Sequence, residues 1–229
     1  MFLRSAAKTA LALALGVSSF HAAVAMAAPV KGTVTLPAEL RSGRRFPGYW
    51  RVENGSVPIA PPANRSESVV VLAGAKGQAP PARTVTVELA GLIATPSTVV
   101  IGPGSVIEFK NSDKVPHDLY IPGGESVMPI QRLAAGALRH QKFQAPGNYE
   151  VRCALTPHVS VSVVVVDTPH FAVADDKGAF KIADAPDGKA TLRVIHQGRI
   201  VHEEPVEVKA GAKDVELRVP EGTRKEAGE

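Results

Sequence analysis

Residues 147–167 read GNYEVRCALTPHVSVSVVVVD, and this stretch decides the fold. A run with strand-forming residues ends at Cys153, a short loop containing Pro157 leads to His158, and a valine-rich run follows. Alternating or continuous apolar runs of this length favour β-strands, and a proline between them favours a turn. The stretch therefore predicts two strands joined by a loop that carries the only cysteine of the 229-residue chain.

The same pattern recurs on both sides of this stretch. The runs TVTVELA, STVVI, SVIEFKN and HDLYIPGG follow one another between residues 84 and 124, and the turns DDKG and APDG separate further runs between residues 171 and 195. Twenty glycines and nineteen prolines are available for turns. Short strands at this spacing predict an all-β chain built of β-sandwiches.

The N-terminus predicts a cleaved secretory signal over residues 1–28. Arg4 and Lys8 precede an apolar stretch over residues 9–20, and small residues lead up to Ala27 and Ala28, either of which is expected to be the last one removed. The apolar stretch is shorter than the ~20 residues that span a bilayer. We therefore expect a periplasmic or secreted protein with no membrane-spanning segment after cleavage.

Charge and motifs exclude several classes of function. The formal net charge is +4, and the basic residues are scattered, which argues against nucleic-acid binding. The basic and aromatic stretch RSGRRFPGYWR, residues 41–51, is expected to be a solvated loop. Neither a Gly-x-Ser-x-Gly motif nor a His-Glu-x-x-His motif occurs, so we do not expect an enzyme.

A lone cysteine in an exported protein leaves three interpretations: a buried inert thiol, an intermolecular disulfide, or a metal ligand. A type-1 copper site needs one thiolate and two imidazoles, often with a weak axial thioether. Cys153 at a strand end, His158 after the next loop, and His117 at another strand end could supply such a set.

Residues 83–167 resemble the cupredoxins, the blue-copper family. The resemblance lies in STVVIGPGSVIEFKNSDKVPHDLYIPGG, with its Gly-containing turn and first histidine, and in FQAPGNYEVRCALTPH, which approaches the copper loop. It implies a Greek-key sandwich, one type-1-like copper ion held by His117, Cys153 and His158, and a periplasmic redox partner protein.

The copper loop departs from the family pattern. No methionine follows His158, and Met128 lies too far back in the sequence to be assigned as an axial ligand. Aligned through the proline with the Cys-x-x-His-Pro-x-Met form of the loop, Thr156 takes the place of the second histidine and Val159 that of the methionine. The choice between Thr156 and His158 stays open at this point, and His140 is a weaker alternative ligand.

The C-terminal part resembles a carboxypeptidase regulatory-like, or transthyretin-like, sandwich through DDKGAFKI and DAPDGKATLRV. Such modules begin with strands like those found upstream, near residues 32–34 and 69–72. We therefore expect residues 30–80 and 168–222 to form one sandwich into which residues 83–167 are inserted, followed by a disordered tail over residues 223–229. Three consecutive units are the alternative. Some methylamine-utilisation-type periplasmic proteins resemble this combination.

Two functions of different class follow. The first is a periplasmic copper-binding protein that transfers electrons or holds copper. The second is a metal-free scaffold or binding protein that keeps the cupredoxin fold without copper.

Overall fold

The computed structural model describes residues 28–41 and 67–223. The predicted signal up to residue 27, the stretch at residues 42–51 and the tail at residues 224–229 lie outside the described residues. Ala28, the final residue of the predicted signal, is the first residue of a strand and is buried. Within the described residues, no helix combines the length and the apolar character that crossing a bilayer requires.

The chain is all-β, as predicted, with two sandwiches. The first, which we call the inserted sandwich, contains β3 (Thr84–Ala90), β4 (Ile93–Thr95), β5 (Thr98–Ile101), β6 (Ser105–Asn111), β7 (His117–Tyr120), β8 (Gln131–Leu133), β9 (Leu138–Phe143), β10 (Gly147–Cys153) and β11 (Ser160–Val165). The second, which we call the terminal sandwich, contains β1 (Ala28–Thr35), α1 (Ala38–Arg41), β2 (Ser68–Ala73), β12 (Phe171–Val173), β13 (Ala179–Ala185), β14 (Gly188–His196), β15 (Arg199–Val208) and β16 (Val215–Arg218).

The inserted sandwich packs a sheet of order β5-β11-β10-β7-β8 against a sheet of order β4-β3-β6-β9. Most neighbours are antiparallel, but β5 and β11 are parallel, as are β3 and β6. Alternating residues such as Val87 and Leu89 on β3, and Ile107 and Phe109 on β6, are fully buried between the sheets. The period of two in the sequence is therefore the alternation between core and surface faces.

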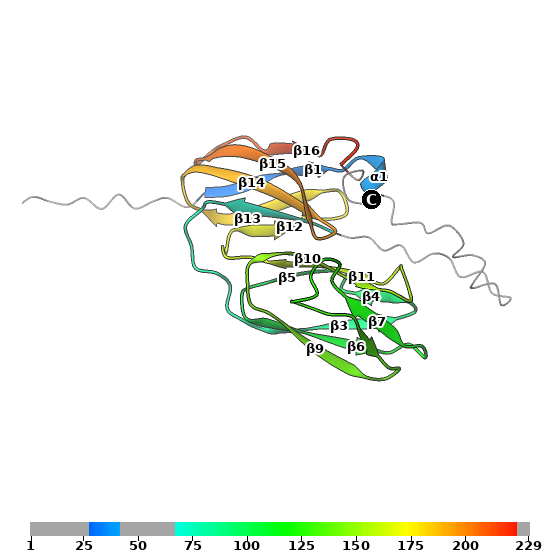
Figure 1. The fold of residues 1–229 in the computed structure, drawn as a ribbon. Helices are drawn as coiled ribbons and strands as arrows, with labels where there is room; N and C mark the ends of the chain where they lie inside the picture. The colour runs from blue at the N-terminus through cyan, green and yellow to red at the C-terminus, as the bar shows by residue number, and fades with distance from the viewer. Residues whose placement is uncertain (1–27, 42–66, 224–229) are drawn as a thin grey trace, which may run out of the picture.

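The terminal sandwich is assembled from both ends of the described chain. Strand β1 lies between β13, to which it is antiparallel, and β16, to which it is parallel. Strand β2 lies between β12 and β14 in the other sheet. Figure 1 shows blue β1 beside red β16 in one body, with the inserted sandwich as the other body.

The close packing around β1 depends on a glycine. A Cβ atom at Gly32 would lie 2.1 Å from the backbone oxygen of Val215 and 2.9 Å from the ring of Phe180. No larger residue fits between β13 and β16 at this point.

The two sandwiches meet at an apolar junction. The buried residues Val69, Val71 and Ile195 of the terminal sandwich share a cluster with Val100 and Val164 of the inserted sandwich. The tip of the β14–β15 hairpin also contacts β10 and β11, where the backbone N–H of Gly198 donates to the hydroxyl of Ser162 at 3.0 Å. The junction therefore reaches the strand that carries the cysteine.

Candidate metal centre

Two of the three predicted ligands meet on neighbouring strands. Strand β7 begins at His117, β10 ends at Cys153, and the two strands are antiparallel with Cys153 opposite Leu119. Since side chains two residues apart share a face of a sheet, His117 and Cys153 both point into the core. His117 is 0% exposed and Cys153 is 4% exposed, and His117 Nδ1 lies 3.6 Å from Cys153 Sγ.

The far side of the His117 ring faces a carboxylate. His117 Nε2 lies 2.9 Å from Asp113 Oδ2. The carboxylate also accepts hydrogen bonds from the backbone N–H of Gly91 at 2.6 Å and of Leu92 at 3.2 Å. His117 is thus held between a sulfur atom and a carboxylate that is itself tied to the β3–β4 turn.

Asn111 fixes the loop that carries Asp113. Its buried amide nitrogen donates to the carbonyls of Val115, Leu133 and Ala134. Its side-chain oxygen accepts from the backbone N–H of Asp113 at 2.9 Å. Each buried polar group of this asparagine therefore has a partner, which holds the approach to β7 in one conformation.

A tight loop surrounds the sulfur. The backbone N–H of Thr156 donates to Cys153 Sγ at 3.3 Å. The N–H of Val159 donates to the carbonyl of Thr156 at 3.0 Å, and the N–H of Cys153 donates to the carbonyl of Val159 at 3.1 Å. Residues 156–159 thus form a turn with Pro157 at its second position, where proline is favoured.

The contacts shift the pKa values of both partners toward the charged forms. Burial acts to raise the pKa of the Cys153 thiol, but hydrogen bonds with His117 and with the backbone of Thr156 outweigh burial, so the pKa is lowered from 9.0. Burial acts to lower the pKa of His117, but hydrogen bonds with Cys153 and Asp113 outweigh it, so the pKa is raised from 6.5. A thiolate is the form of cysteine that binds metals.

The distance between the two donors suits a bridging metal ion. For bonds of about 2.3 Å to sulfur and about 2.0 Å to nitrogen, as in zinc sites, an Sγ···Nδ1 distance of 3.6 Å gives a sulfur–metal–nitrogen angle of about 110°. This angle is close to trigonal or tetrahedral coordination. Sulfur and imidazole are also the donors that copper and zinc accept.

The third predicted ligand does not complete the set in this structure. His158 is 8% exposed and is the third residue of the turn at residues 156–159. Within residues 28–41 and 67–223, no three side chains of His, Cys, Asp or Glu are grouped so that they could hold a metal ion. Of the two residues considered for the position of the second histidine, Thr156 contacts the sulfur through its backbone N–H. Val159, which aligns with the family's methionine in the alternative alignment, is buried in the core.

The weaker alternative, His140, is not near this centre. It lies on β9 in the opposite sheet, opposite Glu108 in the register, and its Nε2 is 2.9 Å from Glu108 Oε2 on the exposed surface. Met128, in contrast, is 0% exposed and belongs to the same core cluster as Cys153. Distance along the sequence was therefore a poor guide to where Met128 lies.

The sequence interpretation did not assign Asp113 to the site. The signal that could have identified it is the spacing of four residues between Asp113 and His117 across a short loop. The N–H of Thr156 carried no signal, because a backbone donor is not visible in residue types.

No family model matches the sequence, and no curated protein matches it significantly. Among solved structures, amicyanin from Paracoccus versutus is 19% identical, and the match covers 42% of this chain and 97% of that chain with a TM-score of 0.34. A reduced Cu(I) form of an amicyanin variant is 17% identical over 36% of this chain and 82% of that chain, with a TM-score of 0.33. A purple cupredoxin from Nitrosopumilus maritimus is 19% identical over 36% of this chain and 99% of that chain, with a TM-score of 0.31.

Proposed function

We propose that this chain is a periplasmic, cupredoxin-like copper protein that carries single electrons or holds copper, and that it does no chemistry on a bound substrate. The observation that carries the proposal is the buried pair of Cys153 Sγ and His117 Nδ1 at 3.6 Å, with the other ring nitrogen on a carboxylate. Copper bound there would supply the change between Cu(II) and Cu(I), and a periplasmic redox protein would exchange the electron.

The protein's own residues would bind the ion and exclude water. Cys153 would bind as a thiolate, which its lowered pKa favours. His117 would bind through Nδ1. His158 would supply the third donor from the loop that joins Cys153 to β11. The apolar core around these side chains, with Leu119 and Val159 buried, limits access of water.

The test is addition of Cu(II) to the purified protein. We expect an intense visible band from charge transfer between thiolate sulfur and copper, which disappears in Cys153→Ser. His158→Gln should weaken or abolish the band, and His140→Gln is the matched control, since His140 lies on the other sheet at the surface. A wild-type protein without the band, or a His158→Gln protein with an unchanged band, contradicts the proposed ligand set.

A metal-free scaffold is the second candidate function. The favouring observation is that Cys153 packs within the apolar core cluster, while no group of three metal-binding side chains is gathered in the described part of the chain. A buried cysteine can act simply as a small apolar side chain. In that case Cys153→Ala should leave folding and partner binding intact, and copper should give no thiolate band in the wild type.

A further inference from the structure

The carboxylate of Asp113 is 11% exposed and has three neighbours that can donate to it. Oδ1 accepts from the backbone N–H of Gly91, Oδ2 accepts from the backbone N–H of Leu92, and Oδ2 faces Nε2 of His117 at 2.9 Å. A carboxylate of this kind can only accept hydrogen bonds. In the neutral ring of His117 beside the thiol form of Cys153, the proton therefore sits on Nε2, and the Nδ1 lone pair faces Cys153 Sγ, whose S–H can donate to it.

The turn that holds this carboxylate has an uncommon backbone. Gly91 and Leu92 are consecutive residues with positive φ, at 64° and 63°. This left-handed pair is typical of a tight hairpin turn, but leucine rarely adopts it. Its two N–H groups converge on Asp113, so the β3–β4 turn fixes the position of a side chain that lies in the loop before β7.

We propose that Asp113 is a positioning residue for the metal centre: it selects the Nε2–H form of His117 and so aims the Nδ1 lone pair at the place beside Cys153 Sγ where a metal ion would bind. This inference rests on the proposed metal-binding function for the role of the lone pair. The structural part of the inference is that a carboxylate anchored on the β3–β4 turn chooses the position of the ring proton. This part does not depend on metal binding. Partners of this kind orient metal-binding histidines and influence metal affinity in other proteins.

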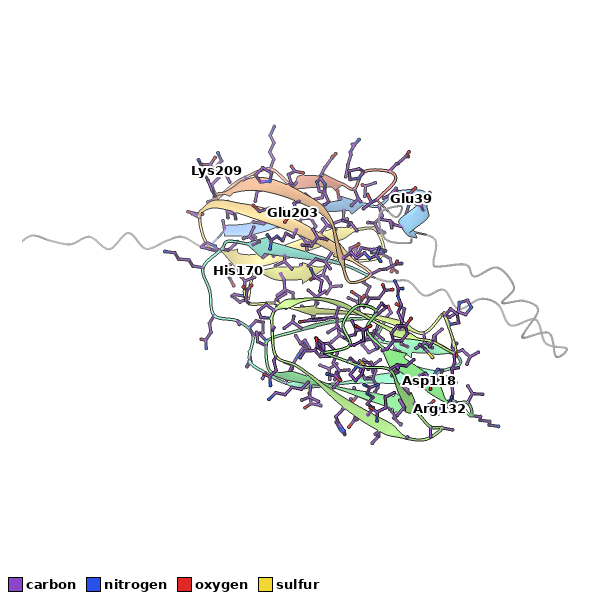
Figure 2. The ribbon with its side chains drawn as sticks, in the orientation of Figure 1. Glu39, Asp118, Arg132, His170, Glu203 and Lys209 are labelled. Carbon is purple, nitrogen blue, oxygen red and sulfur yellow. The ribbon has the colours of Figure 1, made fainter. Side chains whose placement is uncertain are left out.

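Asp113→Asn is the informative substitution because it keeps the size of the side chain. The amide oxygen can take the place of Oδ1, which lies within reach of the N–H groups of both Gly91, at 2.6 Å, and Leu92, at 3.4 Å, and the amide nitrogen then faces Nε2 of His117. That nitrogen is a donor, so the ring must carry its proton on Nδ1, toward the sulfur. The matched control is Asp118→Asn, which makes the same change of charge one residue from His117, at a carboxylate paired with Arg132 (Figure 2).

The first measurement needs no copper and is made in Cys153→Ala protein, because a Cys153 thiolate would be a second acceptor for the ring proton. Nitrogen NMR of the ring of His117, recorded at a pH where the ring is neutral, should show the proton on Nε2. In this background the proton should move to Nδ1 in Asp113→Asn and stay on Nε2 in Asp118→Asn. A ring protonated on Nδ1 while Asp113 is present overturns the inference, and this result counts even if Asp113→Asn does not fold.

The second measurement is a Cu(II) titration of the three proteins. We expect Asp113→Asn to lose 10–100-fold in copper affinity, a range typical for loss of such partners, while Asp118→Asn stays within a few-fold of wild type. Equal affinities for Asp113→Asn and Asp118→Asn overturn the positioning role at the metal. If no protein binds copper but the proton moves in Asp113→Asn, the proposed metal function fails and the control of His117 by Asp113 is upheld.

Discussion

The contact between the hairpin tip of the terminal sandwich and β10 makes a strong quantitative prediction. Gly198 has a φ of 72°, and a Cβ atom there would lie 2.8 Å from the backbone oxygen of Tyr149 and 3.0 Å from the Cβ of Glu150. In Gly198→Ala, the left-handed backbone costs about 1–2 kcal/mol. Crowding against rigid backbone adds about 1–3 kcal/mol. The free energy of unfolding should therefore fall by roughly 2–5 kcal/mol.

Gly211→Ala is the control that separates these two contributions. Gly211 has nearly the same φ, 73°, but a Cβ atom there would have no heavy atom within 4 Å. It should lose only the backbone part, about 1–2 kcal/mol. With a urea dependence of about 2 kcal/mol per molar, an additional loss of about 2 kcal/mol in Gly198→Ala lowers the unfolding midpoint by about 1 M more than in the control.

The assay is urea unfolding of the metal-free proteins, followed by circular dichroism. Equal midpoints for the two variants would refute the reasoning, because they would mean that the hairpin tip does not press on β10 in solution. A larger loss in Gly198→Ala shows that the two sandwiches are docked where the structure places them.

Three further predictions can be checked with single substitutions. The ultraviolet absorbance of the Cys153 thiolate in the metal-free protein should titrate below 9.0, and in His117→Gln the titration should move to higher pH because burial then dominates. Since the pKa of Cys153 is lower in the folded than in the unfolded protein, the stability that this thiolate contributes is present above 9.0 and is lost as the pH falls through the folded pKa. Arg139→Met should lower the free energy of unfolding by about 2–4 kcal/mol, because the buried guanidinium donates to two backbone carbonyls that would lose their donors. Urea unfolding measures this loss, and an unchanged midpoint contradicts the prediction. Gly32→Ala should lower the free energy of unfolding by about 3 kcal/mol or more, on the order of the largest core effects, since its Cβ would lie 2.1 Å from the backbone oxygen of Val215. A loss below about 1 kcal/mol would show that β1 can shift between its neighbours.

The sequence predicted the strands with a clear period of two or a long apolar run. The runs at residues 84–90, 105–111 and 147–153 are strands, because alternating residues bury one face of a sheet. It did not predict β8, whose three residues are too few to show a period. Parallel pairing, as between β3 and β6, has no signal in either run alone because it depends on how distant segments pack.

For the candidate site, the sequence could predict the residues whose types bind metals. Cys153 and His117 were predicted to meet, and they do, at the ends of adjacent strands. Asp113 was missed because turn formation already accounts for an aspartate after a strand, and its contact with the ring appears only once the loop is folded. His140 was held as an alternative, yet the register of β9 against β6 pairs it with Glu108.

The two candidate functions differ in one side chain and not in the fold. On one side of the loop, Cys153 Sγ accepts from the N–H of Thr156, and the Cys153 N–H donates to the carbonyl of Val159. On the other side, Val159 is buried in the core. His158 lies between these two anchors, in a turn closed by the hydrogen bond from the N–H of Val159 to the carbonyl of Thr156. The proposed ligand set requires the His158 ring to join the sulfur and the His117 ring, which already lie 3.6 Å apart. The copper protein and the metal-free scaffold would share this core, and the placement of His158 decides between them.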